Sequence, residues 1–268
     1  MKYHNIESTI EDLVTAELAK LSHTNHVRIL HAVESGSRAW GFASPDSDYD
    51  VRFIYVRTHD AYLSLNPHKD YIDGILDETL DINGWDLTKF LQQIHRANAT
   101  VFEWLNSPII YQTTHPVMEH IRLVAERYFA IKPFLYHYYG TAKNNYESSL
   151  KEAFVKYKKY FYVLRPLLAC QWIEEKRTPP PVLFQTLLDN LPDLSLKHEI
   201  ASLRIQKMQM TESEKGPAIA TLHAYIEDRL SYYSSLIPTL SEDRNPNWDD
   251  LNRVFREILS DERTCPQS

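Results

Sequence analysis

The first third of the chain alternates between helical and strand-like hydrophobic patterns. VRILHAV at residues 27–33 is a short apolar run that predicts a strand, and YDVRFIYV at 49–56 alternates by parity and predicts a second. TLDINGW at 79–85 predicts a third strand. Before them, apolar residues at helical spacing predict an amphipathic helix over residues 6–21: Ile6, Ile10, Leu13, Val14, Leu18 and Leu21.

A helix follows the third strand, and from about residue 116 onward the pattern becomes almost entirely helical. DLTKFLQQIHRA, residues 86–97, has one apolar face, and Asp86 is placed to cap it. Three consecutive prolines within TPPPV, residues 178–182, must interrupt the later helices. Those helices are expected over residues 116–130, 134–150, 152–176, 181–190, 195–210, 214–236 and 248–260. The pattern therefore predicts an α+β domain over 1–125 and a helical C-terminal domain over 126–268.

Composition narrows the class of protein. The 268 residues are 43% hydrophobic and 24% charged, which is typical of a globular protein. No apolar run is long enough to span a bilayer, and the N-terminus does not have the pattern of a signal peptide. Two cysteines cannot form a disulfide framework. We therefore expect a cytoplasmic protein, and the net charge of −7 disfavours broad, unspecific nucleic-acid binding.

The strand at 49–56 carries the first chemical signal. Side chains alternate between the faces of a strand, so Asp48, Asp50 and Arg52 share one face with Ile54 and Val56. The other face, from Tyr49 to Tyr55, is a core-facing row. Two carboxylates about 6–7 Å apart repel each other unless a cation lies between them. Hard divalent cations prefer carboxylate oxygens together with substrate phosphates, so this pair predicts a Mg²⁺ (or Mn²⁺) site.

A candidate phosphate-binding turn precedes that strand. Gly36 would let the backbone approach a phosphate closely, and Ser37 adds a hydroxyl beside the amides of a helix that starts there. Arg38 could add a charge-assisted contact, although a surface ion pair is an equally good interpretation. Phosphate donors beside metal-binding carboxylates indicate a nucleoside triphosphate with its bound metal.

The spacing of these residues resembles a known superfamily. Gly36 and Ser37, ten further residues and then Asp48-Tyr49-Asp50 are similar to the motif of the DNA polymerase β superfamily. The longer stretch GSRAWGFASPDSDYDVR, with GWDL and FEWLNSPIIY after it, resembles the RlaP-type family of nucleotidyltransferases associated with RNA repair. The strong motifs cover residues 34 to about 110, and KYKKYFYVLRPLLACQWI carries the looser match beyond them. The resemblance implies a polymerase-β-like nucleotidyltransferase domain with a mixed sheet and flanking helices, two metal ions and a nucleoside triphosphate.

The superfamily also uses a third carboxylate from a neighbouring strand. Asp77, Glu78, Asp81 and Asp86 are the candidates. Asp81 lies mid-strand with apolar neighbours on both sides, whereas Asp86 is better explained as a helix cap, so we expect Asp81. The resemblance implies that Asp48 and Asp50 bind both metals and that Asp81 holds the one that activates the nucleophile. Ser37 and Arg38 would then hold the β- and γ-phosphates.

The helical half offers further candidates. Lys158, Tyr162 and Arg165 recur at i, i+4 and i+7 and share a helical face. By analogy with relatives that reach the nucleotide from their second domain, Lys158, Lys159 and Tyr162 would contact it. The alternative is a solvated basic face beside an aromatic core stripe.

The sequence therefore predicts a metal-dependent transfer of a nucleoside monophosphate from a nucleoside triphosphate to an acceptor hydroxyl, with release of pyrophosphate. The acceptor could be an RNA end, a protein or a small molecule. One alternative is a catalytically silent nucleotide-binding or antitoxin-like partner-binding module, and another is a nucleotide sensor without turnover. The presence of Ser37, Asp48 and Asp50 together favours the enzyme, because a decayed site usually loses a metal ligand.

Overall fold

A mixed five-stranded sheet organises one lobe of the molecule, which is described here from a computed structural model covering residues 7–66, 68–77, 79–209, 211 and 214–261. The strand order is β3-β4-β2-β1-β5. β2 pairs in parallel with β4, and the other pairings are antiparallel. The strands are β1 (Arg28–Glu34), β2 (Tyr49–Val56), β3 (Tyr71–Asp77), β4 (Leu80–Asp86) and β5 (Ile110–Thr113). The mixed sheet with flanking helices confirms the fold class expected from the sequence.

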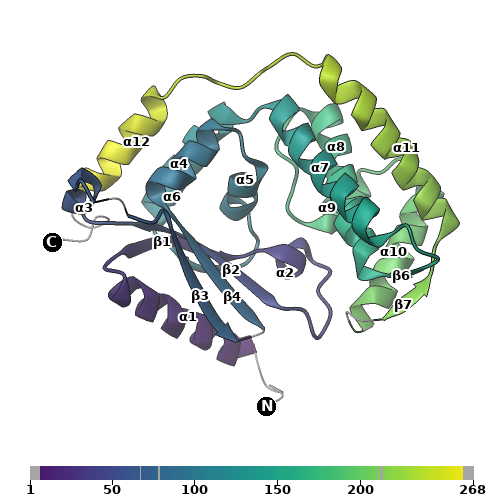
Figure 1. The fold of residues 1–268 in the computed structure, drawn as a ribbon, viewed down its shortest axis with the longest axis horizontal. Helices are drawn as coiled ribbons and strands as arrows, with labels where there is room; N and C mark the ends of the chain where they lie inside the picture. The colour runs from purple at the N-terminus through teal and green to yellow at the C-terminus, as the bar shows by residue number, and fades with distance from the viewer. Residues whose placement is uncertain (1–6, 67, 78, 210, 212–213, 262–268) are drawn as a thin grey trace.

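Helices cover both faces of this sheet (Figure 1). Helix α1 (Glu7–Thr24) lies on one face, where it packs against Val51, Phe53 and Tyr55 of β2. The opposite face, which includes Ile54 and Val56, belongs to a second buried cluster. That cluster includes residues of α4 (Leu87–His95), α5 (Ala99–Leu105), α6 (His115–Ala125) and α12 (Asp249–Ser260). The alternation of side chains predicted for residues 49–56 is confirmed, and the two faces of this strand contribute to two separate buried clusters. Two short helices, α2 (Gly36–Trp40) and α3 (His59–Leu63), follow β1 and β2.

The second lobe is almost entirely helical. It also holds a small two-stranded antiparallel sheet of β6 (Phe154–Lys156) and β7 (Lys215–Pro217), so the helices expected over 152–176 and 214–236 begin later than predicted. Gly216 packs closely against Tyr157, since a Cβ there would lie 2.2 Å from the Tyr157 hydroxyl oxygen. The elements are η1 (Glu126–Tyr128), α7 (Ile131–Ser149), β6 (Phe154–Lys156), α8 (Lys158–Lys176), α9 (Phe184–Asp189), α10 (Leu194–Gln209), β7 (Lys215–Pro217), α11 (Ala220–Leu236) and η2 (Ile237–Thr239).

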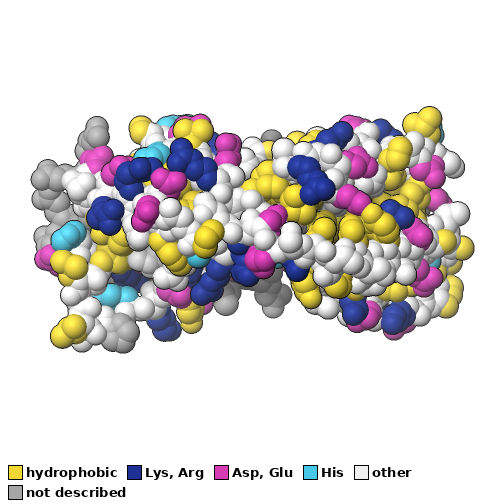
Figure 2. Space-filling model, turned by 90° about the horizontal axis from the view of Figure 1, so that it is seen from above, with side chains coloured by type: hydrophobic (Ala, Val, Ile, Leu, Met, Phe, Trp, Pro, Cys, Tyr) yellow, Lys and Arg dark blue, Asp and Glu magenta, His cyan; other side chains and the backbone are white. Residues whose placement is uncertain are grey.

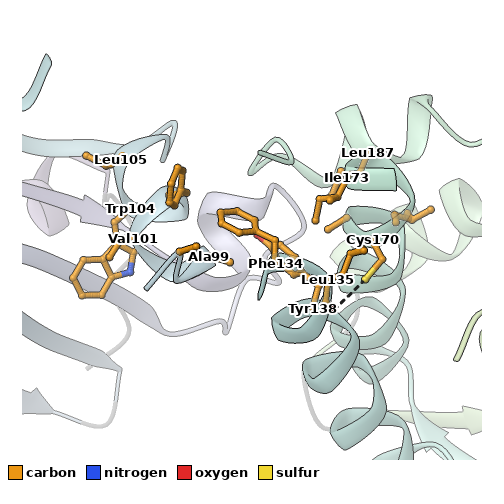
Figure 3. Packing of buried hydrophobic residues seen from close by; sticks show 14 of the residues in the cluster. Ala99, Val101, Trp104, Leu105, Phe134, Leu135, Tyr138, Cys170, Ile173 and Leu187 are labelled. Atoms are coloured by element: carbon orange, nitrogen blue, oxygen red, sulfur yellow. Dashed lines mark hydrogen bonds between the residues drawn. The ribbon is translucent and has the colours of Figure 1, made fainter. Parts of the chain in front are cut away.

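The two lobes share one continuous core. The cluster that includes Ile54 and Val56 extends through α5 into α7 and α8. Figure 3 shows Val101 and Trp104 on one side and Phe134 and Tyr138 on the other. The rings of Phe102 and Phe134 lie 4.9 Å apart across this junction. Seen from above, the body is long and narrower between the lobes (Figure 2). The division at residue 125 stays a prediction.

The end of the described chain returns to the sheet lobe. After η2, residues 240–248 cross from the helical lobe, and α12 packs beside α4 and α6 (Figure 1). Asp243 anchors the crossing, because its carboxylate accepts hydrogen bonds from the backbone amides of Ile131 (2.6 Å) and Lys132 (3.2 Å). The Tyr128 hydroxyl donates to the carbonyl of Asn247 at 2.7 Å. None of the helices in the described ranges has the length and apolar character needed to cross a bilayer.

Candidate functional site

Two of the predicted carboxylates face each other across paired strands. In the parallel register of β2 and β4, Asp50 lies opposite Asp81, so the two side chains emerge on the same face of the sheet. Asp48 is exposed and lies two residues before Asp50, just ahead of β2. Register thus places side by side two acids that are far apart in the sequence.

Arg52 lies between these two acids. Its Nη2 donates to Asp50 Oδ1 at 3.1 Å and to Asp81 Oδ2 at 2.8 Å. Its Nη1 donates to the carbonyls of Val51 (3.0 Å) and Asp81 (3.2 Å). One guanidinium therefore bridges both acids and offsets one of their two negative charges. Strand alternation predicted that Arg52 lies on the same face as Asp50, but no function was predicted for it.

The glycine turn packs directly against Asp50. Gly36 has a φ of +62°, in the left-handed region that favours glycine. A Cβ at this position would lie 2.2 Å from Asp50 Oδ2, which is far inside van der Waals contact. The amide of Ser35 also donates to the Asp50 carbonyl at 2.8 Å. Ser37 follows in the one-turn helix α2 and is buried. The turn and the acid therefore form one unit.

Glu34 holds Asp50 from the other side of the sheet. Its Oε1 accepts from the Asp50 amide at 2.8 Å, and its Oε2 accepts from the Tyr111 hydroxyl at 2.5 Å. Burial raises the pKa of Glu34 above the usual value for a glutamate, although these hydrogen bonds oppose the shift. The pKa of Asp50 is also raised, first by burial and further by the charges of Asp81 and Asp48, while Arg52 lowers it. The electrostatics of the site therefore favour a bound cation.

Arg38 is engaged with the loop between α2 and β2. Its Nη2 donates to the carbonyl of Ser47 at 2.7 Å and its Nε to that of Asp48 at 3.1 Å. The guanidinium stacks 3.6 Å above the ring of Tyr49, which packs with the α1 cluster on the face opposite Asp50. In this structure Arg38 shapes the loop that leads to Asp48. The predicted phosphate contact stays a prediction.

Of the residues predicted from the helical half, Tyr162 packs beside α2. The ring of Tyr162 is 5.7 Å from that of Trp40, the last residue of α2, and Lys159 Nζ is 5.5 Å from the Tyr162 ring. Lys158 is the first residue of α8. Lys207 of α10 is buried and donates to the carbonyl of Phe42 at 2.6 Å, which fixes the chain just after α2. The start of α8 is therefore brought next to the glycine turn's helix.

A buried charge pair joins the lobes at the same helix. Glu103 of α5 accepts hydrogen bonds from Arg165 Nη1 (2.8 Å), the Tyr138 hydroxyl (2.9 Å) and Trp40 Nε1 (3.3 Å). Arg165 is 3% exposed, stacks 4.4 Å from the Trp40 ring and donates to the Val182 carbonyl. Burial disfavours ionised Glu103, but Arg165 and the hydrogen bonds outweigh it, so its pKa lies below the usual value.

The sequence pattern did not predict this network around Glu103, because helical spacing assigns Arg165 to the same face as Lys158 and Tyr162. A single charged residue within an apolar helical stretch, such as Glu103 between Phe102 and Trp104, was the available signal.

The other candidates for the third carboxylate fare differently. Asp86 is the N-cap of α4, accepting from the Thr88 amide (2.8 Å) and hydroxyl (2.6 Å), as expected. It is also buried and paired with Arg57. Glu78 and the side chain of Asp77 lie outside the described residues. Asp81 is thus the candidate whose side chain is placed beside Asp50.

The donor set fits a hard divalent cation. Asp50 and Asp81 offer carboxylate oxygens on neighbouring strands, Asp48 lies exposed nearby, and a cationic guanidinium already lies in the gap. Among the described side chains, no group of three or more His, Cys, Asp or Glu is assembled as a ready-made cage. Magnesium sites of this kind commonly use one or two carboxylates, with water and substrate phosphates completing the shell. Asp48, Asp50 and Asp81 therefore fit a site for a divalent cation.

The mixed sheet and the sequence pattern together define a polymerase-β-type nucleotidyltransferase, which is a class of transferase. The chain matches the family described as RlaP, the RNA repair pathway DNA polymerase beta family, over residues 10–257, and it belongs to that family.

Two further likenesses accompany this match. The chain is 39% identical over 246 residues to the uncharacterized protein YcgL of Bacillus subtilis (strain 168), covering 91% of this chain and 95% of that protein. A crystal structure of a nucleotidyltransferase-like protein from Exiguobacterium sibiricum 255-15 aligns with 95% of this chain and 85% of its own. That alignment has 14% identity and a TM-score of 0.30.

Proposed function

We propose that this protein transfers a nucleoside monophosphate from a nucleoside triphosphate to an acceptor hydroxyl in a Mg²⁺- or Mn²⁺-dependent reaction that releases pyrophosphate. The observation that carries the proposal is the register of β2 and β4, which sets Asp50 opposite Asp81 with Gly36 packed against Asp50. Family membership supports the class of reaction.

The acids have separable tasks in this proposal. Asp48, Asp50 and Asp81 would hold the divalent ions, which supply electrostatic stabilisation of the attacking and leaving oxygens. Asp81 has a side chain 55% exposed, so it can face an incoming hydroxyl and accept its proton. Glu34 keeps Asp50 in place through the Asp50 amide. Most of the rate enhancement would come from positioning and charge rather than from covalent catalysis.

The phosphates are assigned to the neighbouring turn and to the second lobe. Gly36 packs against Asp50 and Ser37 follows it in α2, so a triphosphate whose metal is bound at Asp50 would reach this turn. The support for Lys158, Lys159 and Tyr162 is that all three lie at the start of α8, where the Tyr162 ring packs against Trp40 of α2. Arg38 would contribute after exchanging a loop carbonyl for a phosphate oxygen.

The acceptor is proposed to be an RNA end. The support is the description of the family, which names an RNA repair pathway. On the face seen in Figure 2, the described Lys and Arg side chains are interspersed with Asp and Glu, in keeping with the net charge of −7. Recognition would therefore depend on local contacts near the site rather than on a broad basic surface. The cytoplasmic location stays a prediction.

The test combines metal binding with turnover. Mn²⁺ binding is measured by electron paramagnetic resonance, and each α-labelled nucleoside triphosphate is incubated with RNA, protein and small-molecule acceptors. Asp50→Ala and Asp81→Ala should lose Mn²⁺ binding and labelled product together. Asp60→Asn, an exposed acid on α3, is the matched control and should retain both. Turnover unchanged in Asp50→Ala, or no triphosphate binding in the wild type, would refute the proposal.

A further inference from the structure

Arg52 occupies the position between the two acids that the proposed metal would bridge. A single nitrogen, Nη2, contacts one oxygen of each carboxylate, at 3.1 and 2.8 Å. The side chain is 19% exposed, so this ion pair is partly shielded from water. A divalent ion placed between the same oxygens would meet a guanidinium of like charge. Arg52 and a bridging ion therefore cannot share this place.

The contacts also limit how far Arg52 must move. Nη1 is bound to the carbonyls of Val51 and Asp81, which stay in the sheet whatever the side chain does. Releasing Nη2 from the carboxylates leaves a cation that needs a new anionic partner at the mouth of the site. A triphosphate that arrives with the metal would supply one, because guanidinium groups form strong bidentate contacts with phosphate oxygens.

The geometry points to Arg52 as an internal counter-ion that pairs with Asp50 and Asp81 and moves to the triphosphate when the metal binds. This inference rests on the proposed function. Metal binding alone must displace the guanidinium and leave it unpaired, whereas metal and nucleotide together give it a partner. Arg52 therefore makes the two ligands bind cooperatively, and it is a positioning residue rather than a metal ligand.

The test measures Mn²⁺ affinity with and without a nucleoside triphosphate analogue whose α,β-bridge cannot be cleaved. In the wild type, the analogue should tighten Mn²⁺ binding strongly. Arg52→Gln should bind Mn²⁺ alone about tenfold more tightly than the wild type, equivalent to about 1.4 kcal/mol, and should gain much less from the analogue. Arg28→Gln, at the opposite end of β1 and exposed, removes the same charge and should change neither value.

A measurement on the wild type guards against a variant that fails to fold. The Nε–H resonance of Arg52, assigned by comparison with Arg52→Lys, should shift when Mg²⁺ and the analogue are added together. An unchanged resonance at saturating Mg²⁺ and analogue, or Mn²⁺ affinity in Arg52→Gln equal to or below that of the wild type, would overturn the inference alone. Absence of any Asp50-dependent Mn²⁺ binding in the wild type would overturn the proposed function and this inference with it.

Discussion

The buried pair between Glu103 and Arg165 gives the sharpest quantitative prediction. Replacing Glu103 by Ala leaves the Arg165 guanidinium, which is 3% exposed, without its carboxylate. It also removes the acceptor of the Tyr138 hydroxyl and of Trp40 Nε1. Removing one partner of a buried ion pair costs about 3–5 kcal/mol, because the remaining charge stays desolvated. We therefore expect Glu103→Ala to lose about that much unfolding free energy.

Urea unfolding followed by circular dichroism measures this loss. With a shift of roughly 2–4 °C per kcal/mol for a chain of this size class, the melting temperature should fall on the order of 10 °C. Glu119→Ala is the control, because Glu119 forms an exposed pair with Arg122 on α6 and should cost less than about 1 kcal/mol.

A double variant separates the charge from the packing. Glu103→Met with Arg165→Met removes both charges and should recover most of the stability lost by the single change, because no unpaired ion is left in the junction. A Glu103→Ala variant within about 1 kcal/mol of the wild type would refute this reasoning. A double variant no more stable than the single one would refute it equally.

Three more predictions concern the site and the cap of α4. In Gly36→Ala, the backbone at residue 36 must keep its left-handed conformation, which costs about 1–2 kcal/mol of stability. The added Cβ must also displace Asp50, so Mn²⁺ binding should be lost. The control Gly140→Ala on α7, with open space around it, should be neutral or stabilising by about 0.5–1 kcal/mol in the same assays. Because the pKa of Asp50 is raised in the folded state, ionisation of Asp50 lowers the stability of the protein above that pKa. At pH 8 with a metal chelator present, Asp50→Asn should therefore have a higher melting temperature than the wild type, and the difference should vanish as the pH falls below about 4. A lower melting temperature for Asp50→Asn at pH 8 would contradict this reasoning. Asp86→Ala removes the cap of α4 and should cost about 0.5–2 kcal/mol or more, while Thr88→Val, which keeps the capped amide, should cost less in the same denaturation curves.

Local patterns predicted the elements on which the site is built. The strand over 49–56 is found with the bounds expected, because its alternation and its flanking polar turn agree with one another. The cap at Asp86 follows from the same kind of local signal. Strand β3 was missed because YIDGILD combines a glycine with two acids and pairs with β4 alone. Strand β5 was missed because it has only four residues.

The chemistry that sequence could not supply depends on partners from distant segments. Asp81 was expected from its place in a strand, but only the parallel register sets it opposite Asp50. Gly36 was assigned to a close approach of phosphate, and the structure adds a steric reason in Asp50 itself. The bridging role of Arg52 and the support from Glu34 arise from these same pairings, so neither has a sequence motif of its own.

The returning segment at residues 240–248 has a consequence for how the two lobes can move. The chain leaves the sheet lobe just before Ile131 and comes back past Asp243, and hydrogen bonds join these two crossings. Both backbone connections between the lobes therefore lie close together on one side of the molecule (Figure 1). Because the lobes also share a buried core and the Glu103–Arg165 pair, the two connections reinforce a fixed junction, and the start of α8 stays beside α2. A chain shortened at residue 240 would lose this second connection together with the part of the shared core that α12 supplies.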